Sequence, residues 1–267
     1  MISIDGHKIT PTIFPDKTSQ VWKLDEKVLD AIRRQTENVE ICWDFENEAE
    51  LVHCLQLACI VRKENPNASF SLYMPYLPYA RQDKDISNDE TFALLPFLSL
   101  LVYVFPKIKV FDPHSRDMLD YVYGSDCTIE QPEEEINYAI EETDATMICY
   151  PDKGAAQRYP FLSRMPCVTM DKVRDQSTGE ITGMVCDKPE TVLYQNVLIV
   201  DDMCDGGRTF REAAKILYAA GANDVNLYVS HGIFSHPEGV GILYQEGISK
   251  VFTKDGVAYD KPQAVFL

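Results

Sequence analysis

The chain has 267 residues, enough for two domains of roughly 130 residues, each with its own hydrophobic core. Hydrophobic residues make up 45% and charged residues 25% of the sequence, as in an ordinary folded protein, which excludes wholesale disorder. The formal net charge is −17, because 42 Asp and Glu outnumber 25 Lys and Arg. Such an acidic surface repels phosphate backbones and anionic lipid, which argues against nucleic-acid or membrane partners.

Cysteine usage and the absence of targeting signals bear on the compartment. The eight cysteines show no C-x-x-C spacing, and several lie in apolar stretches, which favours reduced, buried thiols over a zinc or disulfide framework. The N-terminus has no basic-then-apolar signal segment, and the longest apolar runs are too short to span a bilayer. We therefore expect a soluble cytoplasmic protein.

The first half of the chain alternates between strand-like and helix-like patterns. In chain order we expect a hairpin of 2–4 and 8–9 around Asp5-Gly6, strands at 19–24 and 39–43, a helix from Glu48, a strand at 69–74, a polar loop to Asp85, a helix from about Asn88 interrupted by Pro96, and a strand at 107–111. This alternation indicates a sheet covered by helices.

The second half repeats the alternation. We expect a helix at 132–142, strands at 145–150 and 167–171, a return strand at 181–186, a buried strand at 197–200, a helix from Thr209 to about Ala220 closed by Gly221, and a strand at 225–230. The pattern predicts the α/β class, with two domains that each hold a mainly parallel sheet flanked by helices. We place the domains at residues 1–123 and 124–267.

The strongest chemical signal is an acidic pair before a glycine loop. The apolar run 197–200 leads to Asp201 and Asp202, and Gly206, Gly207 and Thr209 follow. We expect Thr209 to cap a helix. Glycine-rich turns at a helix N-terminus direct backbone amides toward an anion such as phosphate. The neighbouring carboxylates suit sugar hydroxyls or a hydrated Mg²⁺. A solvated acid pair beside an ordinary loop is the alternative, and the full stretch of residues 197–210 disfavours it.

This stretch resembles the phosphoribosyl-pyrophosphate (PRPP) motif of type I phosphoribosyltransferases and ribose-phosphate pyrophosphokinases. The resemblance implies two type I phosphoribosyltransferase-like domains, with Asp201 and Asp202 on the ribose hydroxyls. It assigns the 5-phosphate to the loop made of Asp205, Gly206, Gly207, Arg208 and Thr209. Pyrophosphokinases usually carry Thr-Ala-Gly-Thr after the third acid, so this chain loses a hydroxyl and gains Arg208.

A second segment separates the two families. Residues 75–83 resemble the pyrophosphokinase signature Pro-Tyr-x-x-Tyr-Ala-Arg-Gln-Asp, which simple phosphoribosyltransferases lack. The resemblance implies ATP binding by Arg81, Gln82 and Asp83, and the guanidinium fork of Arg81 suits a triphosphate. A polar loop whose tyrosines pack on the core is the weaker alternative.

Two further strand ends supply a candidate metal site. His114 follows the strand at 107–111 within a segment similar to the family's Asp-Leu-His, and Asp152 lies in a segment similar to its Pro-Asp-x-Gly. The resemblance implies that both hold Mg²⁺ and that His114 also contacts ATP. One His and one Asp with water and phosphate oxygens suit this ion, which is rarely held by protein ligands alone.

Cations for catalysis come from residues 170–175, which resemble the Asp-Lys-x-Arg start of the family's flexible catalytic loop. Lys172 and Arg174 are one residue apart on an extended segment, so both can face one phosphoryl group. Without this context a Lys-x-Arg pair is usually surface charge.

The segment from Phe14 to Val21 resembles Phe-x-Asp-Gly-Glu-x-x-Val, with Thr18 in place of the Glu. In the family this element reaches the adenine site of a neighbouring subunit. The resemblance therefore implies adenine contacts by Phe14 and Asp16, and a homo-oligomer of at least two copies.

Together the motifs predict a short, divergent ribose-phosphate pyrophosphokinase that converts ATP and ribose 5-phosphate, with Mg²⁺, into PRPP and AMP. Two alternatives stay open. One is a phosphoribosyltransferase that consumes PRPP, and the other is a non-catalytic homologue that regulates an active enzyme.

Overall fold

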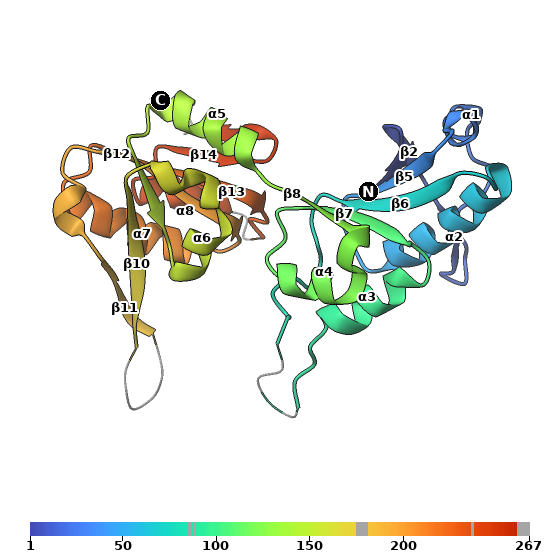
Figure 1. The fold of residues 1–267 in the computed structure, drawn as a ribbon, viewed down its shortest axis with the longest axis horizontal. Coiled ribbons are helices and arrows are strands. Elements are labelled where there is room, and N and C mark those ends of the chain that lie inside the picture. Colours follow the sequence, from blue (N-terminus) through green and yellow to red (C-terminus); the bar gives the residue numbers. More distant parts are fainter. Residues whose placement is uncertain (85–86, 88, 175–180, 236–237, 261–267) are drawn as a thin grey trace. The chain divides into compact units, whose positions relative to one another are not determined.

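The computed structural model describes residues 1–84, 87, 89–174, 181–235 and 238–260 (Figure 1). The chain forms two compact α/β units, Met1–Gln131 and Pro132–Leu267. The division falls later than the expected boundary between residues 123 and 124. The reason is that Cys127–Glu130 forms a strand, β8, which pairs in parallel with β7 and so completes the sheet of the first unit.

The first unit is built on a sheet with the strand order β2-β1-β5-β6-β7-β8, of which β5 to β8 are parallel. Its strands are β1 (Ile2–Ile4), β2 (His7–Ile9), β5 (Asn38–Trp43), β6 (Ser69–Met74), β7 (Lys107–Phe111) and β8, with a separate hairpin of β3 (Thr12–Ile13) and β4 (Ser19–Gln20). Its helices are α1 (Glu26–Arg34), α2 (Ala49–Glu64), α3 (Leu94–Val102) and α4 (Arg116–Tyr123), followed by a 3-10 turn at Gly124–Asp126.

Local chemistry explains where these elements agree with the sequence pattern and where they differ. Asp5 and Gly6 both have positive φ, 48° and 74°, as a two-residue hairpin turn requires. The strand expected at 19–24 ends at Gln20, because the N–H of Val21 donates to the side chain of Gln56 (2.7 Å) on α2. Helix α3 begins at Leu94, so Pro96 lies in its first turn, where its missing N–H removes no intrahelical bond.

The second unit has the strand order β11-β10-β9-β12-β13-β14-β15, parallel from β10 to β14 and antiparallel at both edges. Its elements are α5 (Glu133–Thr143), β9 (Met147–Tyr150), α6 (Lys153–Arg158), β10 (Cys167–Arg174), β11 (Ile181–Cys186), β12 (Asn196–Cys204), α7 (Arg208–Ala219), β13 (Asp224–Gly232), α8 (Gly239–Gln245), β14 (Lys250–Thr253) and β15 (Gly256–Asp260), with 3-10 turns at Pro160–Arg164 and Pro189–Thr191.

The central strand β12 is buried on both faces. Val197 and Ile199 pack in one apolar cluster, which includes Leu217 of α7, and Leu198 packs in another, which includes Ile136 of α5. Alternate residues of a strand face opposite sides of the sheet, so the two clusters are its two covered faces. The predicted class, mainly parallel sheets flanked by helices, is confirmed in both units.

Strands β10 and β11 form an antiparallel hairpin that extends beyond the rest of the second unit (Figure 1). This arrangement matches the strand and return strand expected from the sequence. None of the helices in the described ranges is long and apolar enough to cross a lipid bilayer.

Candidate functional site

The acid pair lies at the carboxyl-terminal part of β12. This strand runs to Cys204, so Asp201 and Asp202 belong to it and do not follow it as expected. Strand β12 extends beyond the apolar run because it stays paired with β13 there, with Asp201 opposite Val229. The side chain of Asp202 is 4% exposed and that of Asp201 is 19% exposed. Two neighbouring carboxylates are thus held largely away from water, which requires a compensating cation.

Arg158 provides that cation. Its Nη1 lies 3.4 Å from Oδ1 of Asp201 and also forms an ion pair with Oδ1 of Asp202. Arg158 is the last residue of α6 and is 11% exposed. The sequence analysis did not select it. One available signal was its place soon after β9, because the carboxyl ends of neighbouring parallel strands meet at one edge of the sheet.

The burial and the charges of this cluster shift the pKa of Asp201. Burial, followed by the negative charge of Asp202 beside it, raises the pKa of Asp201 well above its usual value of 3.8. Arg158 and the backbone N–H of Asp202, which donates to Oδ1 of Asp201 (2.9 Å), lower this pKa and offset part of the rise. With both carboxylates ionised, the cluster would carry one more negative charge than the guanidinium neutralises, which favours ligands that donate hydrogen bonds or carry positive charge.

The glycine loop joins β12 to α7 and differs in detail from the expected one. Gly207 is the N-cap of α7 and has φ +68°, so the helix begins at Arg208 and Thr209 lies inside it instead of capping it. The first N–H groups of any α-helix have no carbonyl partner within the helix, and five residues, 203–207, separate those of α7 from the acid pair. The loop thus has the features of an anion cradle.

Two side chains of the loop have partners of their own. Oδ1 of Asp205 accepts hydrogen bonds from the N–H (3.0 Å) and hydroxyl (2.6 Å) of Ser235, which ties the loop to the segment after β13. Arg208 is 80% exposed and pairs with Glu212 on the same helix, Nε to Oε1 at 3.0 Å. The phosphate contacts expected of these residues remain predictions.

Asp152 lies at the other end of α6 from Arg158. It is the N-cap of this helix, and its Oδ1 accepts a hydrogen bond from the N–H of Ala155 (3.0 Å). A Cβ atom on Gly154 would lie 3.2 Å from the same oxygen, so the glycine leaves room for the carboxylate. One short helix therefore connects the candidate metal ligand to the acid pair.

In the first unit, the loop after β6 presents Arg81, Gln82 and Asp83. Arg81 and Gln82 are exposed. The turn is fixed by Tyr79, which has φ +64°, donates its hydroxyl to Oε1 of Glu48 (2.6 Å), and accepts at its carbonyl the N–H of Gln82 (2.8 Å). Tyr79 thus anchors the segment that the sequence assigns to the nucleotide.

His114 follows β7 and is half-buried, between the fully buried Asp112 and the N-terminus of α4. It belongs to the first unit and Asp152 to the second, so their pairing around one metal ion stays a prediction. Within the part of the chain that the structure describes, no three His, Cys, Asp or Glu side chains gather as they would around a metal ion.

The remaining predicted residues lie on hairpins. Oδ1 of Asp16 accepts hydrogen bonds from the hydroxyl (2.7 Å) and N–H (3.0 Å) of Thr18, which lower the pKa of Asp16, and the ring of Phe14 packs edge-on against Trp22. Lys172 and Arg174 lie on β10 opposite Met184 and Ile181 of β11. The side chains of Lys172 and Arg174 lie outside the described residues.

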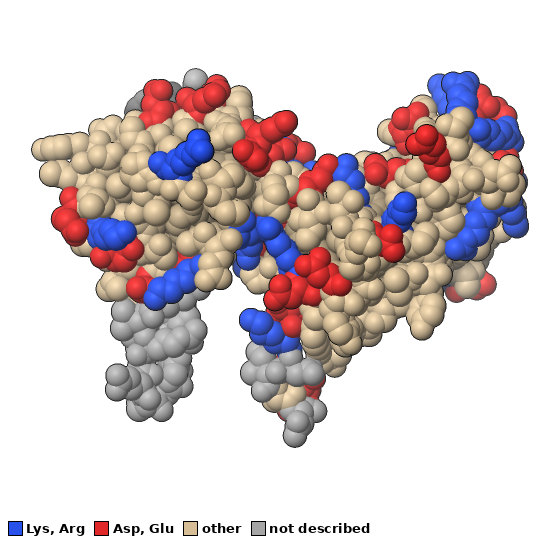
Figure 2. Space-filling view, in the orientation of Figure 1, with Lys and Arg blue, Asp and Glu red and all other residues tan. Residues whose placement is uncertain are grey.

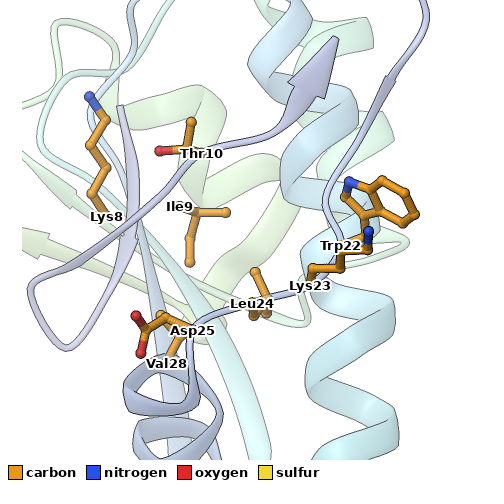
Figure 3. A pocket seen from close by; sticks show the side chains of 8 residues that line it. All are labelled: Lys8, Ile9, Thr10, Trp22, Lys23, Leu24, Asp25 and Val28. Atoms are coloured by element: carbon orange, nitrogen blue, oxygen red, sulfur yellow. The ribbon is translucent and has the colours of Figure 1, made fainter. Parts of the chain in front are cut away.

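The surface adds two observations. On the face drawn in Figure 2, acidic side chains are spread over both units, in keeping with the net charge of −17. A pocket of about 220 Å³ lies in the first unit (Figure 3). It is lined by Lys8, Ile9, Thr10, Trp22, Lys23, Leu24, Asp25 and Val28, and none of these is a predicted site residue.

The raised pKa of Asp201 predicts a stability effect. Because its folded-state pKa lies above the value of the unfolded chain, ionisation of Asp201 destabilises the fold as the pH rises above about 4. Asp201→Asn removes that cost, so we expect its melting temperature at pH 7 to exceed that of the wild type by a few degrees, roughly the effect of 1 kcal/mol. This gain should vanish near pH 4. Asp205→Asn is the control and should show no gain; a lower melting temperature for Asp201→Asn at both pH values would contradict the analysis.

Gly206 and Gly207 are adjacent but differ in conformation and surroundings, so their alanine variants can be compared directly. A side chain at Gly207 meets a positive φ and would place Cβ 2.7 Å from Cδ2 of Leu243, whereas a Cβ on Gly206 meets no atom within 4 Å. We expect Gly207→Ala to lower the free energy of unfolding by about 1–2 kcal/mol or more. Gly206→Ala should stay within about 0.5 kcal/mol of the wild type. Urea denaturation measures both, and equal losses would show that the loop conformation is not as described.

Known proteins resemble the chain in sequence. The second unit contains the match to a family model described as "Phosphoribosyl transferase domain", at residues 135–241. A ribose-phosphate pyrophosphokinase of Saccharolobus solfataricus is 26% identical over 280 residues, which cover 100% of this chain and 93% of the relative. That of Pyrococcus abyssi is 27% identical over 237 residues, covering 88% and 80%.

The fold has a counterpart among solved structures. A crystal structure of phosphoribosylpyrophosphate synthetase from Mycobacterium smegmatis superposes with a TM-score of 0.74 and 20% sequence identity, covering 92% of this chain and 79% of that one. At this identity the likeness concerns the fold. Together with the sequence matches it confirms the resemblance indicated by the motifs: over most of its length the chain is similar to ribose-phosphate pyrophosphokinases.

Proposed function

We propose that the protein is a ribose-phosphate diphosphokinase, which transfers the β,γ-diphosphoryl group of ATP to ribose 5-phosphate and yields PRPP and AMP. The observation that carries the proposal is the joint geometry of the second unit, where a short loop with the left-handed Gly207 joins the strand of the buried acid pair, β12, to the start of α7. The relatives' names point the same way.

Ribose 5-phosphate carries hydroxyl groups and a phosphate, and the site offers carboxylate acceptors and amide donors that match them. Asp201 and Asp202 accept hydrogen bonds from the ribose hydroxyls, because carboxylates in a largely dry setting are strong acceptors. The 5-phosphate binds the loop from Asp205 to Thr209, where the amides at the start of α7 supply donors. Arg208 reaches the phosphate after leaving Glu212, while Asp205 keeps the loop closed through Ser235.

The reaction moves a diphosphoryl group between two oxygens. The C1 hydroxyl oxygen of the sugar attacks the β-phosphorus of ATP, the bond from this phosphorus to the oxygen bridging the α-phosphate breaks, and AMP leaves with the electron pair. The hydroxyl proton passes to solvent. Such transfers depend on alignment and on neutralising charge at the phosphoryl oxygens, the role we assign to Lys172 and Arg174 on β10.

Magnesium fits part of the predicted metal site. Asp152 offers a carboxylate, the oxygen ligand that Mg²⁺ prefers, and Gly154 leaves that carboxylate room. His114 is a nitrogen donor and joins it in the proposal through the family motif. Mg²⁺ bound there supplies charge neutralisation for the diphosphate, and the protein's own residues align the two substrates.

The nucleotide is assigned to the first unit. Arg81, Gln82 and Asp83 bind the ATP phosphates, on a loop that Tyr79 and Glu48 hold in place. Phe14 and Asp16 of a second copy contact the adenine, so we propose a homo-oligomer of at least two copies acting in the cytoplasm.

The rival activities differ in what they need from the chain. A phosphoribosyltransferase that consumes PRPP needs neither the Arg-Gln-Asp loop nor a second unit with its own sheet, and this chain has both. A regulatory homologue needs no catalytic cations, and this chain keeps Lys172 and Arg174. Incubation with ATP, Mg²⁺ and ribose 5-phosphate separates all three, because only the proposed activity forms AMP and PRPP in equal amounts and stops on chelation of the metal.

The two cations on β10 allow catalysis to be separated from binding. If Lys172 and Arg174 contact the phosphoryl group mainly in the transition state, each alanine variant should lose roughly tenfold to a thousandfold in kcat with little change in either KM. Lys188→Ala is the control, because Lys188 is an exposed cation after the same hairpin and solvated cations contribute little. Steady-state kinetics decides; a wild-type kcat in both variants would remove these residues from the mechanism.

A further inference from the structure

Arg158 and the acid pair form a cluster of three charged side chains in the proposed sugar site, and none of the motifs accounts for it. Arg158, Asp201 and Asp202 are 11%, 19% and 4% exposed. Carboxylates this close repel each other, and in a largely dry setting water does little to screen them. A cation that contacts both is therefore what keeps their oxygens at fixed positions.

We infer that Arg158 is a positioning residue for the sugar, which holds the carboxylates of Asp201 and Asp202 in the orientation that accepts two ribose hydroxyls. The inference rests on the proposed function. The guanidinium is planar and carries its donors in a rigid fork, so one group can fix two acceptors at once. Here the same nitrogen, Nη1, contacts Oδ1 of both carboxylates.

The position of Arg158 is itself fixed by the fold. Helix α6 has six residues, from Lys153 to Arg158, and Asp152 caps its start through the N–H of Ala155. The helix follows β9, the direct neighbour of β12 in the sheet. The helix after β9 therefore places the guanidinium of Arg158 against the acid pair on the neighbouring strand β12, before any ligand binds. Preorganisation of this kind lowers the cost of binding.

Loss of Arg158 should weaken the binding of ribose 5-phosphate and leave the binding of ATP nearly unchanged. Without Arg158 the two carboxylates either rotate apart or take up a proton between them, so the site loses two aligned acceptors for the sugar. The residues assigned to ATP belong to the first unit, whereas Arg158, Asp201 and Asp202 belong to the second. A purely structural role would instead lower stability and affect both substrates alike.

The test compares Arg158→Ala, Arg158→Lys and the control Arg164→Ala, since Arg164 is an exposed arginine of the same unit. For Arg158→Ala we expect the KM for ribose 5-phosphate to rise about tenfold to a hundredfold, the usual effect of losing charge-assisted hydrogen bonds. The KM for ATP should change by less than about threefold. Arg158→Lys should fall between the wild type and Arg158→Ala, because an ammonium keeps the charge and loses the fork.

Two further measurements keep the test decisive. Methylguanidinium in solution should lower the KM of Arg158→Ala for ribose 5-phosphate and leave the control unchanged. Calorimetric titration with ribose 5-phosphate should reproduce the loss without turnover, and circular dichroism checks folding; if Arg158→Ala does not fold, Arg158→Lys carries the comparison. An unchanged affinity for the sugar, or equal losses for both substrates, would overturn the inference. Absence of AMP and PRPP with the wild type would instead overturn the proposed function.

Discussion

The site of the second unit depends on one interaction, the ion pairs that Arg158 makes with Asp201 and Asp202. A parallel strand covered on both faces is a costly place for two neighbouring carboxylates, and the same burial raises the pKa of Asp201. In a chain with a net charge of −17 the cation must come from a defined position, because the surface as a whole adds negative potential. Helix α6 supplies it. Asp152 caps the start of the same helix. Six residues of backbone therefore connect this candidate metal ligand to Arg158, which contacts the acid pair.

The loop that follows the acid pair adds the opposite polarity. Gly207 adopts a left-handed conformation that lets α7 begin at once, so backbone donors come next to two acceptors along the chain. A ligand with hydroxyls at one end and a phosphate at the other has this same distribution of polarity. The proposed binding of ribose 5-phosphate therefore follows from how β12 and α7 are joined, while the residues proposed to bind the nucleotide belong to the first unit.

Strong local patterns made much of the fold predictable. Strands β6 and β7 begin and end where expected, since polar and apolar residues largely alternate in both, and Pro75 or Asp112 follows the last residue. The strand expected at 19–24 was wrong because Gln56, distant in sequence, takes the N–H of Val21. The two compact units divide after Gln131, later than the expected 123/124, because β8 pairs back onto β7. Both differences come from long-range pairing, which a local pattern does not contain.

The candidate site was predictable to a similar extent. The acid pair and the glycine loop were found because neighbours in sequence stay neighbours in space. The helix cap was misassigned, since Thr209 is the better capping residue by type but the left-handed Gly207 takes that position. Arg158 was missed because its contact with Asp202 spans two strands and forms only when the sheet does.

The central claim is that the acid pair on β12 is the sugar site, and the double variant Asp201→Asn with Asp202→Asn tests it most directly. Calorimetric titration of the folded variant with each substrate separates the two affinities. The account predicts that the affinity for ribose 5-phosphate falls at least about tenfold, since neutral amides are weaker acceptors than carboxylates, while the affinity for ATP stays within about threefold. Equal losses for both substrates, or an unchanged affinity for ribose 5-phosphate, would contradict it.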